Sequence, residues 1–470
     1  MLFLPELTLL GAGLILFIFS LGQPSSGKVK AVATGLAALT FLISLLCVGS
    51  EGTLFYGAFQ VDFFSQLFKV LITLGTLLIL LFSATDAGVT KGIQSEYYLF
   101  LFMSVLGLMM LVSSVELLAI FVSLELSSFA VYIMVPMRKN SITKGAQIEA
   151  GIKYLLYGVV ATGLMLFGMS YIYGLTGTTE LSKIAPAMAE LYTQPAAVIA
   201  ILLVLAGFFY KLALFPLHFW VPDIYEGASN ETTAFIAAIP KLAAVAMLIR
   251  LVNLVSGPGQ VMATVLGVCA VLSMFYGNLS ALVQKDIKRL LGFSGIAHAG
   301  FILLGLLTFQ ISGYGTAMYY IMGYLFMNLA CFLVICTISE EGKNVCVEDF
   351  TGLHKRSPLL AITLTVGLFA LAGIPPFVGF TGKFLLLLGA LKQGHLIFVT
   401  LAAINTAIAI YYYLSIVRVT FCTDDGDRGT VTASPVTNGL AILLMLCIIV
   451  MGVLPGQFIE MTSTALKYIN

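Results

Sequence analysis

Long apolar stretches separated by short polar breaks run along the whole chain. A helix that crosses a bilayer needs about 20 mostly apolar residues. When the chain is divided at its clusters of Gly, Pro, Asn and charged residues, the pattern predicts fourteen membrane spans. They cover approximately residues 2–21, 30–49, 64–84, 95–112, 114–137, 149–173, 197–222, 232–255, 260–281, 287–308, 314–338, 357–389, 396–421 and 435–455. The fourth and fifth spans almost touch, so their boundary is the least well defined. The fold class we expect is an all-α integral membrane protein.

Composition agrees with this prediction. Of the 470 residues, 60% are apolar and 10% charged, whereas about 25% of a soluble domain is charged. A water-soluble fold is thereby excluded. The formal net charge of +1 offers no basic surface for nucleic acid, so the expected partner is the lipid bilayer. The amino-terminal stretch lacks a basic leader and a cleavage site, and it is interpreted as a retained first helix.

Motifs for bound cofactors are missing from the sequence. The seven cysteines are scattered without a CxxC pair, which indicates apolar filler rather than a metal site or a disulfide framework. No nucleotide-binding glycine motif and no HExxH motif occurs. We therefore expect no cofactor and no metal in this chain. The energy for directed transport must come from an ion gradient or from partner subunits.

The basic residues between spans are segregated by side. One set of loops contains fourteen, namely Lys28, Lys30, Lys91, Arg138, Lys139, Lys144, Lys285, Lys288, Arg289, Lys343, Lys355, Arg356, Arg418 and Arg428. The other set contains only Lys183, Arg250, Lys392 and Lys467. Because cytoplasmic loops carry the excess of Lys and Arg, the first set is predicted to be cytoplasmic. Both chain ends are then predicted on the outer, periplasmic side.

The remaining five basic residues lie inside predicted spans: Lys69, Lys153, Lys211, Lys241 and Lys383. A lysine at the centre of a spanning helix costs about 2.5–3.5 kcal/mol. Possible acidic partners are Glu125, in the middle of span five, and Glu149, one turn before Lys153. Burial disfavours the charged form of a side chain and pairing favours it, so such groups can gain and lose protons. The row therefore predicts a proton relay.

Structural interpretations stand beside the relay. Lys69 lies near an outer helix end, where its ammonium could reach the headgroups. Glu149 and Lys153 could form a plain helix-end pair. Glu125 and Lys211 could form an ion pair that only holds two helices together.

Two spans are interrupted by proline. Span seven contains Pro216 and Pro222, and span twelve contains Pro375 and Pro376. Proline removes a backbone donor and breaks the helix, and freed backbone groups in a membrane are tolerated only in protein or beside water. Lys211 precedes the first break and Lys383 follows the second. We therefore expect water and polar backbone to reach both lysines.

The two interrupted spans are five spans apart, which predicts a repeat. Spans four to eight and nine to thirteen would form two five-helix units, residues 95–256 and 257–421, and the second is inverted because five is odd. Residues 1–94 form three preceding helices, and residues 422–470 a loop and the last helix. Broken helices at matching positions of inverted units are typical of transporters.

Two histidines could extend the relay. His218 follows Pro216, and His298 lies within span ten; a neutral imidazole can pass a proton between neighbours. A satisfied core histidine is an equally good interpretation of each. His354 and His395 are predicted in loops without a special role.

Several motifs resemble a known family. The runs EAGIKYLLYGVVATG, FYKLALFPLHFWVPDIYEGA, GNLSALVQKDIKRLLGFSGIAHAGF and GIPPFVGFTGKF are similar to those of the antiporter-like membrane subunits of respiratory complex I, NADH-quinone oxidoreductase. The resemblance covers essentially the whole chain, including PEL near its start, and is strongest to the subunit N group. Lysine at 383, and a chain that stops just after span fourteen, favour that group.

The resemblance implies roles for individual residues. Glu125, Lys211, Lys241 and Lys383 would form the proton relay, with Glu125 modulating Lys211 and protons passing by Lys241 and His298 toward Lys383. Where the family commonly has a proline-containing stretch after the span-seven motif, this chain has ASNETTAF. This difference leaves Glu231 as an unexplained acid near Lys241.

The resemblance also implies partners and a location. Other antiporter-like and small helical membrane subunits would adjoin this chain, and the peripheral arm would hold FMN, iron-sulfur clusters and quinone. The protein would lie in the bacterial inner membrane. Three alternatives stay open: a subunit of an Mrp-type cation/proton antiporter, a membrane subunit of a hydrogenase or formate hydrogenlyase, and an anchor whose charges only hold helices together.

Overall fold

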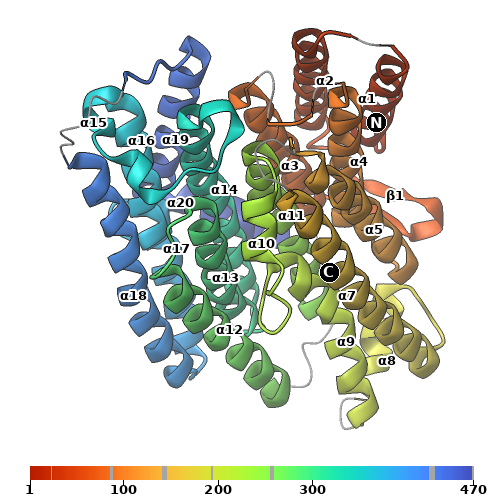
Figure 1. Ribbon diagram of the computed structural model, residues 1–470. Coiled ribbons are helices and arrows are strands. Elements are labelled where there is room, and N and C mark those ends of the chain that lie inside the picture. The colour runs from red at the N-terminus through yellow and green to blue at the C-terminus, as the bar shows by residue number, and fades with distance from the viewer. Residues whose placement is uncertain are drawn as a thin grey trace.

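The protein is predominantly helical, and its helices run side by side as one bundle (Figure 1). The computed structural model describes residues 1–22, 24–84, 88–90, 92–139, 145–191, 194–253, 259–422 and 429–467. Within these ranges, twelve helices are long and apolar enough to cross a membrane, and α1 and α16 are shorter apolar helices. The predicted class of a multi-spanning helical membrane protein is confirmed. The count of fourteen crossings stays a prediction.

The helices follow the apolar stretches of the sequence closely. In chain order they are α1 (Leu4–Ser20), α2 (Ser26–Leu46), α3 (Phe63–Phe82), α4 (Gln94–Ser113), α5 (Leu117–Met134), α7 (Ala146–Thr176), α8 (Leu181–Ala189), α9 (Pro195–Leu212), α10 (Val221–Gly227), α11 (Asn230–Asn253), α12 (Gly259–Ala281), α13 (Ile287–Leu306), α14 (Ile311–Ile338), α15 (Leu353–Arg356), α16 (Pro358–Ala372), α17 (Val378–Lys392), α18 (Leu396–Phe421), α19 (Pro435–Val453) and α20 (Pro455–Leu466). Short 3-10 turns lie at Phe55–Gly57, Val135–Met137, Glu340–Gly342 and Val347–Phe350.

Both proline-containing spans are broken, as predicted. Span seven consists of α9 and the short α10, and Pro222 stands in the first turn of α10. Span twelve consists of α16 and α17, with Pro375 and Pro376 between them. The peptide bonds Phe215–Pro216 and Pro375–Pro376 are cis. At each break, backbone carbonyls that are no longer paired within a helix lie beside buried side chains.

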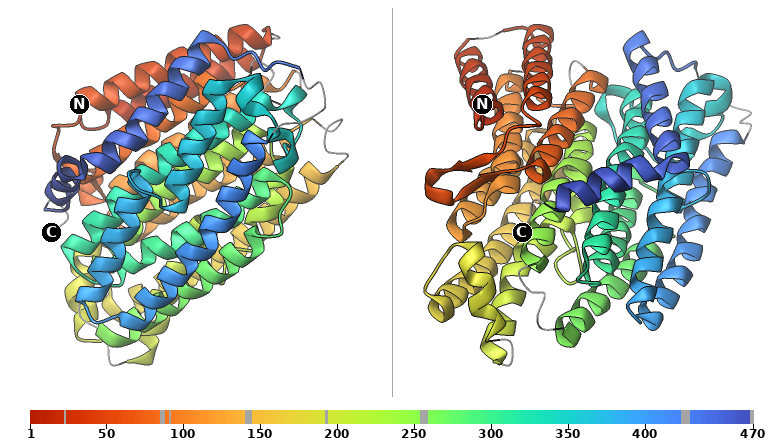
Figure 2. Two further views of the ribbon diagram at one scale, coloured as in Figure 1. Left: turned by 90° about the vertical axis from the view of Figure 1, so that its left-hand side faces the viewer. Right: turned by 180° about the vertical axis from the view of Figure 1, so that it is seen from behind.

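Five elements were not predicted. Strands β1 (Gly52–Leu54) and β2 (Phe59–Val61) form an antiparallel hairpin before α3. Helices α8 and α15 lie in loops. Helix α20 follows α19 and runs across α14 and α3 (Figure 2), within residues 422–470, where the sequence predicts only a loop and one helix. The hydropathy pattern could not show α20, because its short sequence PGQFIEMTSTAL is half polar.

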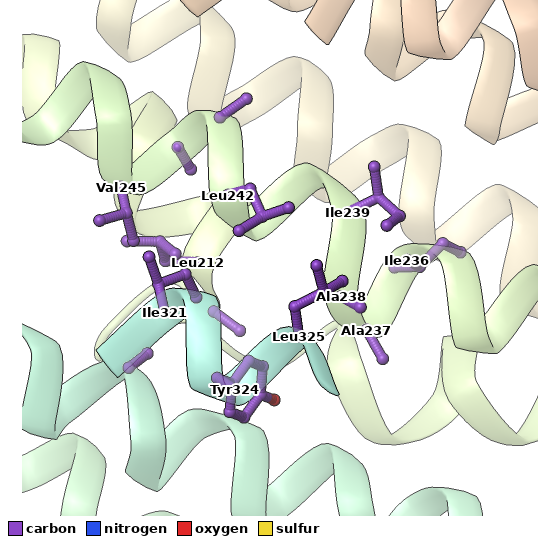
Figure 3. Close-up of a cluster of buried hydrophobic side chains, with 14 of the residues drawn as sticks. Leu212, Ile236, Ala237, Ala238, Ile239, Leu242, Val245, Ile321, Tyr324 and Leu325 are labelled. Atoms are coloured by element: carbon purple, nitrogen blue, oxygen red, sulfur yellow. The ribbon is translucent and has the colours of Figure 1, made fainter. Parts of the chain in front are cut away.

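The centre of the bundle is formed by α11 and α14, which are enclosed by other helices on all sides. Figure 3 shows their shared apolar cluster, with Ile239 and Leu242 of α11 facing Ile321 and Leu325 of α14. Because protein surrounds these helices, their sequences are apolar all round rather than on one face. Alanines such as Ala237 and Ala238, which are buried, let the helices approach closely.

Candidate proton pathway

The three lysines Lys211, Lys241 and Lys383 are each almost completely buried, with 3%, 2% and 4% of their surface exposed. Lys211 stands in the last turn of α9, Lys241 in the middle of α11 and Lys383 near the start of α17. Among the described residues none of the three contacts a carboxylate. The interpretation that these lysines face headgroups is excluded by their burial.

Lys211 is bound by hydroxyl groups. Its Nζ donates to Ser128 Oγ at 3.0 Å and lies 3.5 Å from Ser127 Oγ, both on α5. Glu125, one turn before Ser128, acts on Lys211 only through space. The interpretation of Glu125 and Lys211 as an ion pair in contact is therefore wrong. The direct partners of the Lys211 ammonium are therefore serine hydroxyls.

Glu125 is half-buried at the edge of the protein. Its carboxylate lies beside Thr162 in an apolar groove between α5 and α7, which Phe121, Phe129 and Leu166 also line. Oxygen Oε1 of Glu125 has no hydrogen-bond partner in the described part of the chain. A carboxylate at this position can hold or lose a proton beside Lys211 without breaking a salt bridge.

Lys241 is the first of a row of neighbouring buried polar groups. Its Nζ donates to the hydroxyl of Tyr324 on α14 at 3.1 Å. Figure 3 shows Tyr324 at the edge of the apolar cluster of α11 and α14. Gly295 of α13 makes room for this contact, because a Cβ there would lie 2.7 Å from Lys241 Nζ and 2.9 Å from the Tyr324 hydroxyl.

His298 continues this row between two further tyrosines. Its ring packs against Tyr324 with centroids 5.1 Å apart. Nδ1 lies 2.5 Å from the Tyr320 hydroxyl, and Nε2 lies 3.1 Å from the Tyr413 hydroxyl. An imidazole with a partner on each nitrogen can accept a proton on one side and release one on the other. The role of His298 in a relay stays a prediction.

Lys383 closes the row at the second helix break. Its Nζ donates to the carbonyls of Leu371 at 2.8 Å and Ala372 at 3.1 Å, at the end of α16. Gly382, the residue before Lys383, packs directly on the Tyr320 ring. The break thus supplies polar backbone to the lysine, as the sequence predicted.

The other proposed relay members have different surroundings. His218 is fully buried against Phe219 and Tyr276, and neither ring nitrogen has a hydrogen-bond partner among the described residues. No side-chain hydrogen bond in the described ranges joins Lys211 to Lys241. The predicted row is therefore two groups, one at Lys211 and one from Lys241 to Lys383.

Glu149 and Lys153 belong to an ion-pair cluster at one end of the bundle. Lys153 contacts Glu149 and Asp223 at 2.7 Å each, and Arg289 contacts Asp223 at 3.0 Å and Glu226 at 2.7 Å. Burial raises the pKa of Asp223, but hydrogen bonds from Lys153 and Arg289 bring that pKa below its ordinary value. The Lys153 side chain is 37% exposed. The helix-end interpretation of this pair fits its position.

Two further cations hold the carbonyl end of α10. Arg138 donates to the Glu226 carbonyl at 2.8 Å, and Lys288 to the Ala228 carbonyl at 2.8 Å. Cations suit the negative end of a helix.

Glu231, in the first turn of α11, interacts electrostatically with Lys288 and Arg138. It is ten residues and about 15 Å along the helix from Lys241, so the expected nearness of these two charges was wrong. Of the loop cations, Lys91, Lys144 and Arg428 lie outside the described residues.

Sequence reasoning missed the hydroxyl groups of the pathway. Tyr320 and Tyr324 lie four residues apart on α14, hence on one helix face, and both are fully buried. A pair of tyrosines at this spacing in a spanning helix was a usable signal. The serines that bind Lys211 follow Glu125 by two and three residues and were equally readable.

Comparisons with known proteins agree with this geometry. Residues 114–409 match the family model described as NADH:quinone oxidoreductase/Mrp antiporter, TM. NADH-quinone oxidoreductase subunit N 2 of Opitutus terrae is 46% identical over 469 residues, covering 100% of this chain and 98% of the relative. A chain of respiratory complex I from Thermus thermophilus has a TM-score of 0.84 and 30% identity, covering 97% of this chain and 98% of that one.

The fold is shared more widely than the sequence. A chain of the Mrp complex from Dietzia superposes with a TM-score of 0.84 at 22% identity, covering 98% of this chain and 96% of that chain. This likeness shows the fold alone. The match over most of the chain and the relative at 46% identity decide the family. The chain belongs to the NADH:quinone oxidoreductase/Mrp antiporter family of membrane proteins, in its NADH-quinone oxidoreductase subunit N group.

Proposed function

We propose that the buried lysines are the route by which this proton-translocating membrane subunit of NADH-quinone oxidoreductase carries protons across the bilayer. The observation that supports this most strongly is the chain from Lys241 through Tyr324, His298 and Tyr320 to Lys383. Charged groups inside a membrane mark ion pathways. Here they are joined by hydroxyl and imidazole groups, which can both accept and donate protons.

Each step moves one proton between neighbouring groups. Lys241 in its ammonium form gives a proton to the Tyr324 side, and an imidazole or hydroxyl that receives it releases another toward Lys383. Lysine suits this role because it can deprotonate when buried, whereas arginine cannot. Lys383 holds its proton against two backbone carbonyls. The direction of the steps belongs to this proposal.

In the group of residues around Lys211, the protonation state of Lys211 itself changes. With Glu125 charged, the Lys211 ammonium is stabilised through space; with Glu125 protonated, that stabilisation is lost and Lys211 releases its proton more easily. Two serine hydroxyls hold Lys211 in either state. Proton transfer from Lys211 to Lys241 requires water or a movement of α9, because their side chains are not in contact.

Partner subunits supply the energy. The redox cofactors of NADH-quinone oxidoreductase reside in other subunits, and this chain assembles with other membrane subunits of the complex. We assign the groove between α5 and α7 to a neighbouring membrane subunit. The reason is that the carboxylate of Glu125 opens into this apolar groove, where lipid would leave it unsatisfied.

The membrane topology follows from the basic residues. Fourteen crossings, with α10 and its ion-pair cluster on the cytoplasmic side, leave both chain ends on the periplasmic side. Residues 95–256 and 257–421 then form two inverted five-helix units, each with one broken helix. The protein is a multi-pass protein of the bacterial inner membrane.

Substitution of the lysines in the assembled complex tests the route. We expect Lys211→Met and Lys383→Met to retain quinone reduction by the redox subunits and to lose proton pumping in proteoliposomes. Lys183→Met is the matched control, because its side chain is 64% exposed on α8. Full pumping in both buried variants would refute the route. Cation-dependent exchange in vesicles without redox substrates would instead support an Mrp-type antiporter.

A further inference from the structure

A second group of buried charges lies on the amino-terminal helices, apart from the proposed route. It consists of Glu6 on α1, Asp62 and Lys69 at the start of α3, and Arg250 near the end of α11. Each of the four is at most 5% exposed. Arg250 and the α10 cluster lie at opposite ends of α11, so in the proposed topology this group is on the outer side.

One of the two ion pairs is held by several contacts. The Arg250 guanidinium donates to Asp62 Oδ1 at 3.0 Å and to Oδ2 at 2.8 Å. Asp62 Oδ1 also accepts the Ser65 backbone N–H at 2.7 Å and so caps α3. The guanidinium carbon lies 4.9 Å above the Phe64 ring. These contacts describe a structural clamp between α3 and α11.

The other pair is poorly satisfied. Lys69 Nζ lies 2.7 Å from Glu6 Oε1, and both side chains are 0% exposed. Neither group makes a further hydrogen bond to a described residue, and Oε2 of Glu6 has no partner. Gln66, one turn before Lys69 on the same face of α3, is also fully buried, and both its amide atoms are unmatched. The prediction that Lys69 reaches the headgroups was wrong, because α1 and the hairpin enclose it.

One ion-pair contact offsets only a small part of the desolvation free energy of two buried charges. Burying an ion pair is favourable only when additional hydrogen bonds satisfy the remaining atoms. Both carboxylate oxygens of Asp62 are bonded and one of them also caps α3, although Nε of Arg250 has no partner among the described residues. Glu6 and Lys69 share a single contact. A pair with spare donors and acceptors beside an unmatched amide changes its protonation at lower cost than a clamped one. The difference between the two pairs therefore indicates that Glu6 and Lys69 exchange protons rather than only stabilise the packing of the helices.

The pair is separated from the outer surface by a thin layer. Lys69 Nζ lies 4.9 Å above the ring of Phe59 in β2, and Phe59 packs edge-on against Phe3 and Phe55. Phe55 itself is 57% exposed. Asp62 and Arg250 act electrostatically on Lys69. The Cys47 thiol interacts with both members of the pair and with the amino terminus.

We propose that Glu6 and Lys69 form a second proton-exchanging site, which releases protons to the outer side of the membrane. The Lys69 ammonium gives one proton to the Glu6 carboxylate, which leaves a neutral amine beside a carboxylic acid. The acid then loses that proton to water on the outer side, and the amine takes up another proton from the side of α11, so that the ion pair re-forms. One N–H bond and one O–H bond break and form in each cycle. The inference rests on the proposed proton route, since α3 packs against α11, the helix of Lys241.

The test measures protons translocated per NADH oxidised in the assembled complex, so that differences in assembly cancel. We expect Glu6→Gln, which keeps the shape but cannot ionise, to lower this ratio, and Glu6→Asp to restore most of it. A Glu6→Gln/Lys69→Met double variant removes the uncompensated ammonium and should assemble with the same low ratio. Thr8→Val on the same helix is the control and should leave the ratio unchanged.

The results of the Glu6 variants can be distinguished from a failure of the main proton route. A normal ratio in Glu6→Gln, with pumping lost in Lys383→Met, would overturn this site and leave the route intact. Loss of assembly in both Glu6→Gln and the double variant would show the pair to be structural, which also overturns the proposal. Normal pumping in Lys383→Met would instead refute the route itself.

Discussion

The two broken helices handle the same chemical problem in different ways. At the first break, the Tyr210 carbonyl accepts from Trp220 Nε1 at 2.9 Å, and Lys211 turns away to the hydroxyls of α5. At the second break, Lys383 itself binds the two carbonyls that α16 leaves at its end. The first lysine is therefore free to respond to Glu125, whereas the second is part of the helix break that surrounds it.

This difference has consequences for proton transfer. Lys211 can lose its proton and leave only two hydroxyls to re-orient, which costs little because a hydroxyl both donates and accepts. A neutral Lys383 keeps two protons on its nitrogen and can continue to satisfy both carbonyls. The first site is thus suited to switching and the second to holding a proton in place.

Removing Lys383 should have the largest effect. Lys383→Met leaves the Leu371 and Ala372 carbonyls buried without a donor, at about 1–3 kcal/mol for each. We expect loss of pumping together with a lower unfolding temperature of the purified subunit or complex. Lys211→Met orphans no carbonyl and should lose pumping with a smaller thermal shift. Equal thermal shifts in the two variants would contradict the comparison.

The next largest effect is expected at Gly295. Gly295→Ala would place a methyl group 2.7 Å from Lys241 Nζ and 2.9 Å from the Tyr324 hydroxyl. Overpacking of this kind costs about 1–3 kcal/mol, and here it separates the two groups that begin the chain toward Lys383. Pumping should fall while quinone reduction persists. Gly174→Ala on α7 is the matched control, since its Cβ would meet open space. Unchanged pumping in Gly295→Ala would count against the Lys241–Tyr324 step.

Sequence reasoning succeeded where local chemistry decides the structure. The prolines mark both helix breaks, because a residue without an N–H cannot continue the backbone ladder. The burial of Lys211, Lys241 and Lys383 follows from their places within long apolar stretches. The spacing of Glu149 and Lys153 predicts their contact, which the structure shows at 2.7 Å.

It failed where contacts depend on how helices face each other. Helices α11 and α14 are apolar all round, so no hydrophobic face indicates that Lys241 points to Tyr324. Glu6 and Lys69 are 63 positions apart, and only the packing of α1 on α2 and α4, which both contact α3, brings them together. Glu125 and Lys211 are opposite charges on neighbouring helices, yet serines stand between them. Such pairings are tertiary and leave no periodic signal.

A smaller effect is expected from the serines of the first group. Ser128→Ala removes the 3.0 Å hydrogen bond to Lys211 but leaves Ser127, and a hydrogen bond to a charged group contributes about 1.5–3 kcal/mol. Pumping should be reduced rather than lost, and the Ser127→Ala/Ser128→Ala double variant should approach Lys211→Met. A single variant as inactive as Lys211→Met would mean that Ser128 acts as more than a support.

The smallest effect is expected at the ion-pair cluster on α10. Asp223→Asn removes contacts to Lys153 and Arg289, but these groups are partly exposed, and such pairs contribute about 0–1 kcal/mol. Because the pKa of Asp223 is below its ordinary value despite the opposing effect of burial, its contribution is present at neutral pH and is lost as the pH falls through that lowered pKa. Thermal unfolding should therefore distinguish Asp223→Asn from the wild type slightly at pH 7, and the difference should disappear as the pH falls through that lowered pKa. A large effect on pumping at pH 7 would mean that α10 belongs to the proton route. It would contradict the proposed difference between the Lys211 site, which changes its protonation, and α10, which the ion pairs only stabilise.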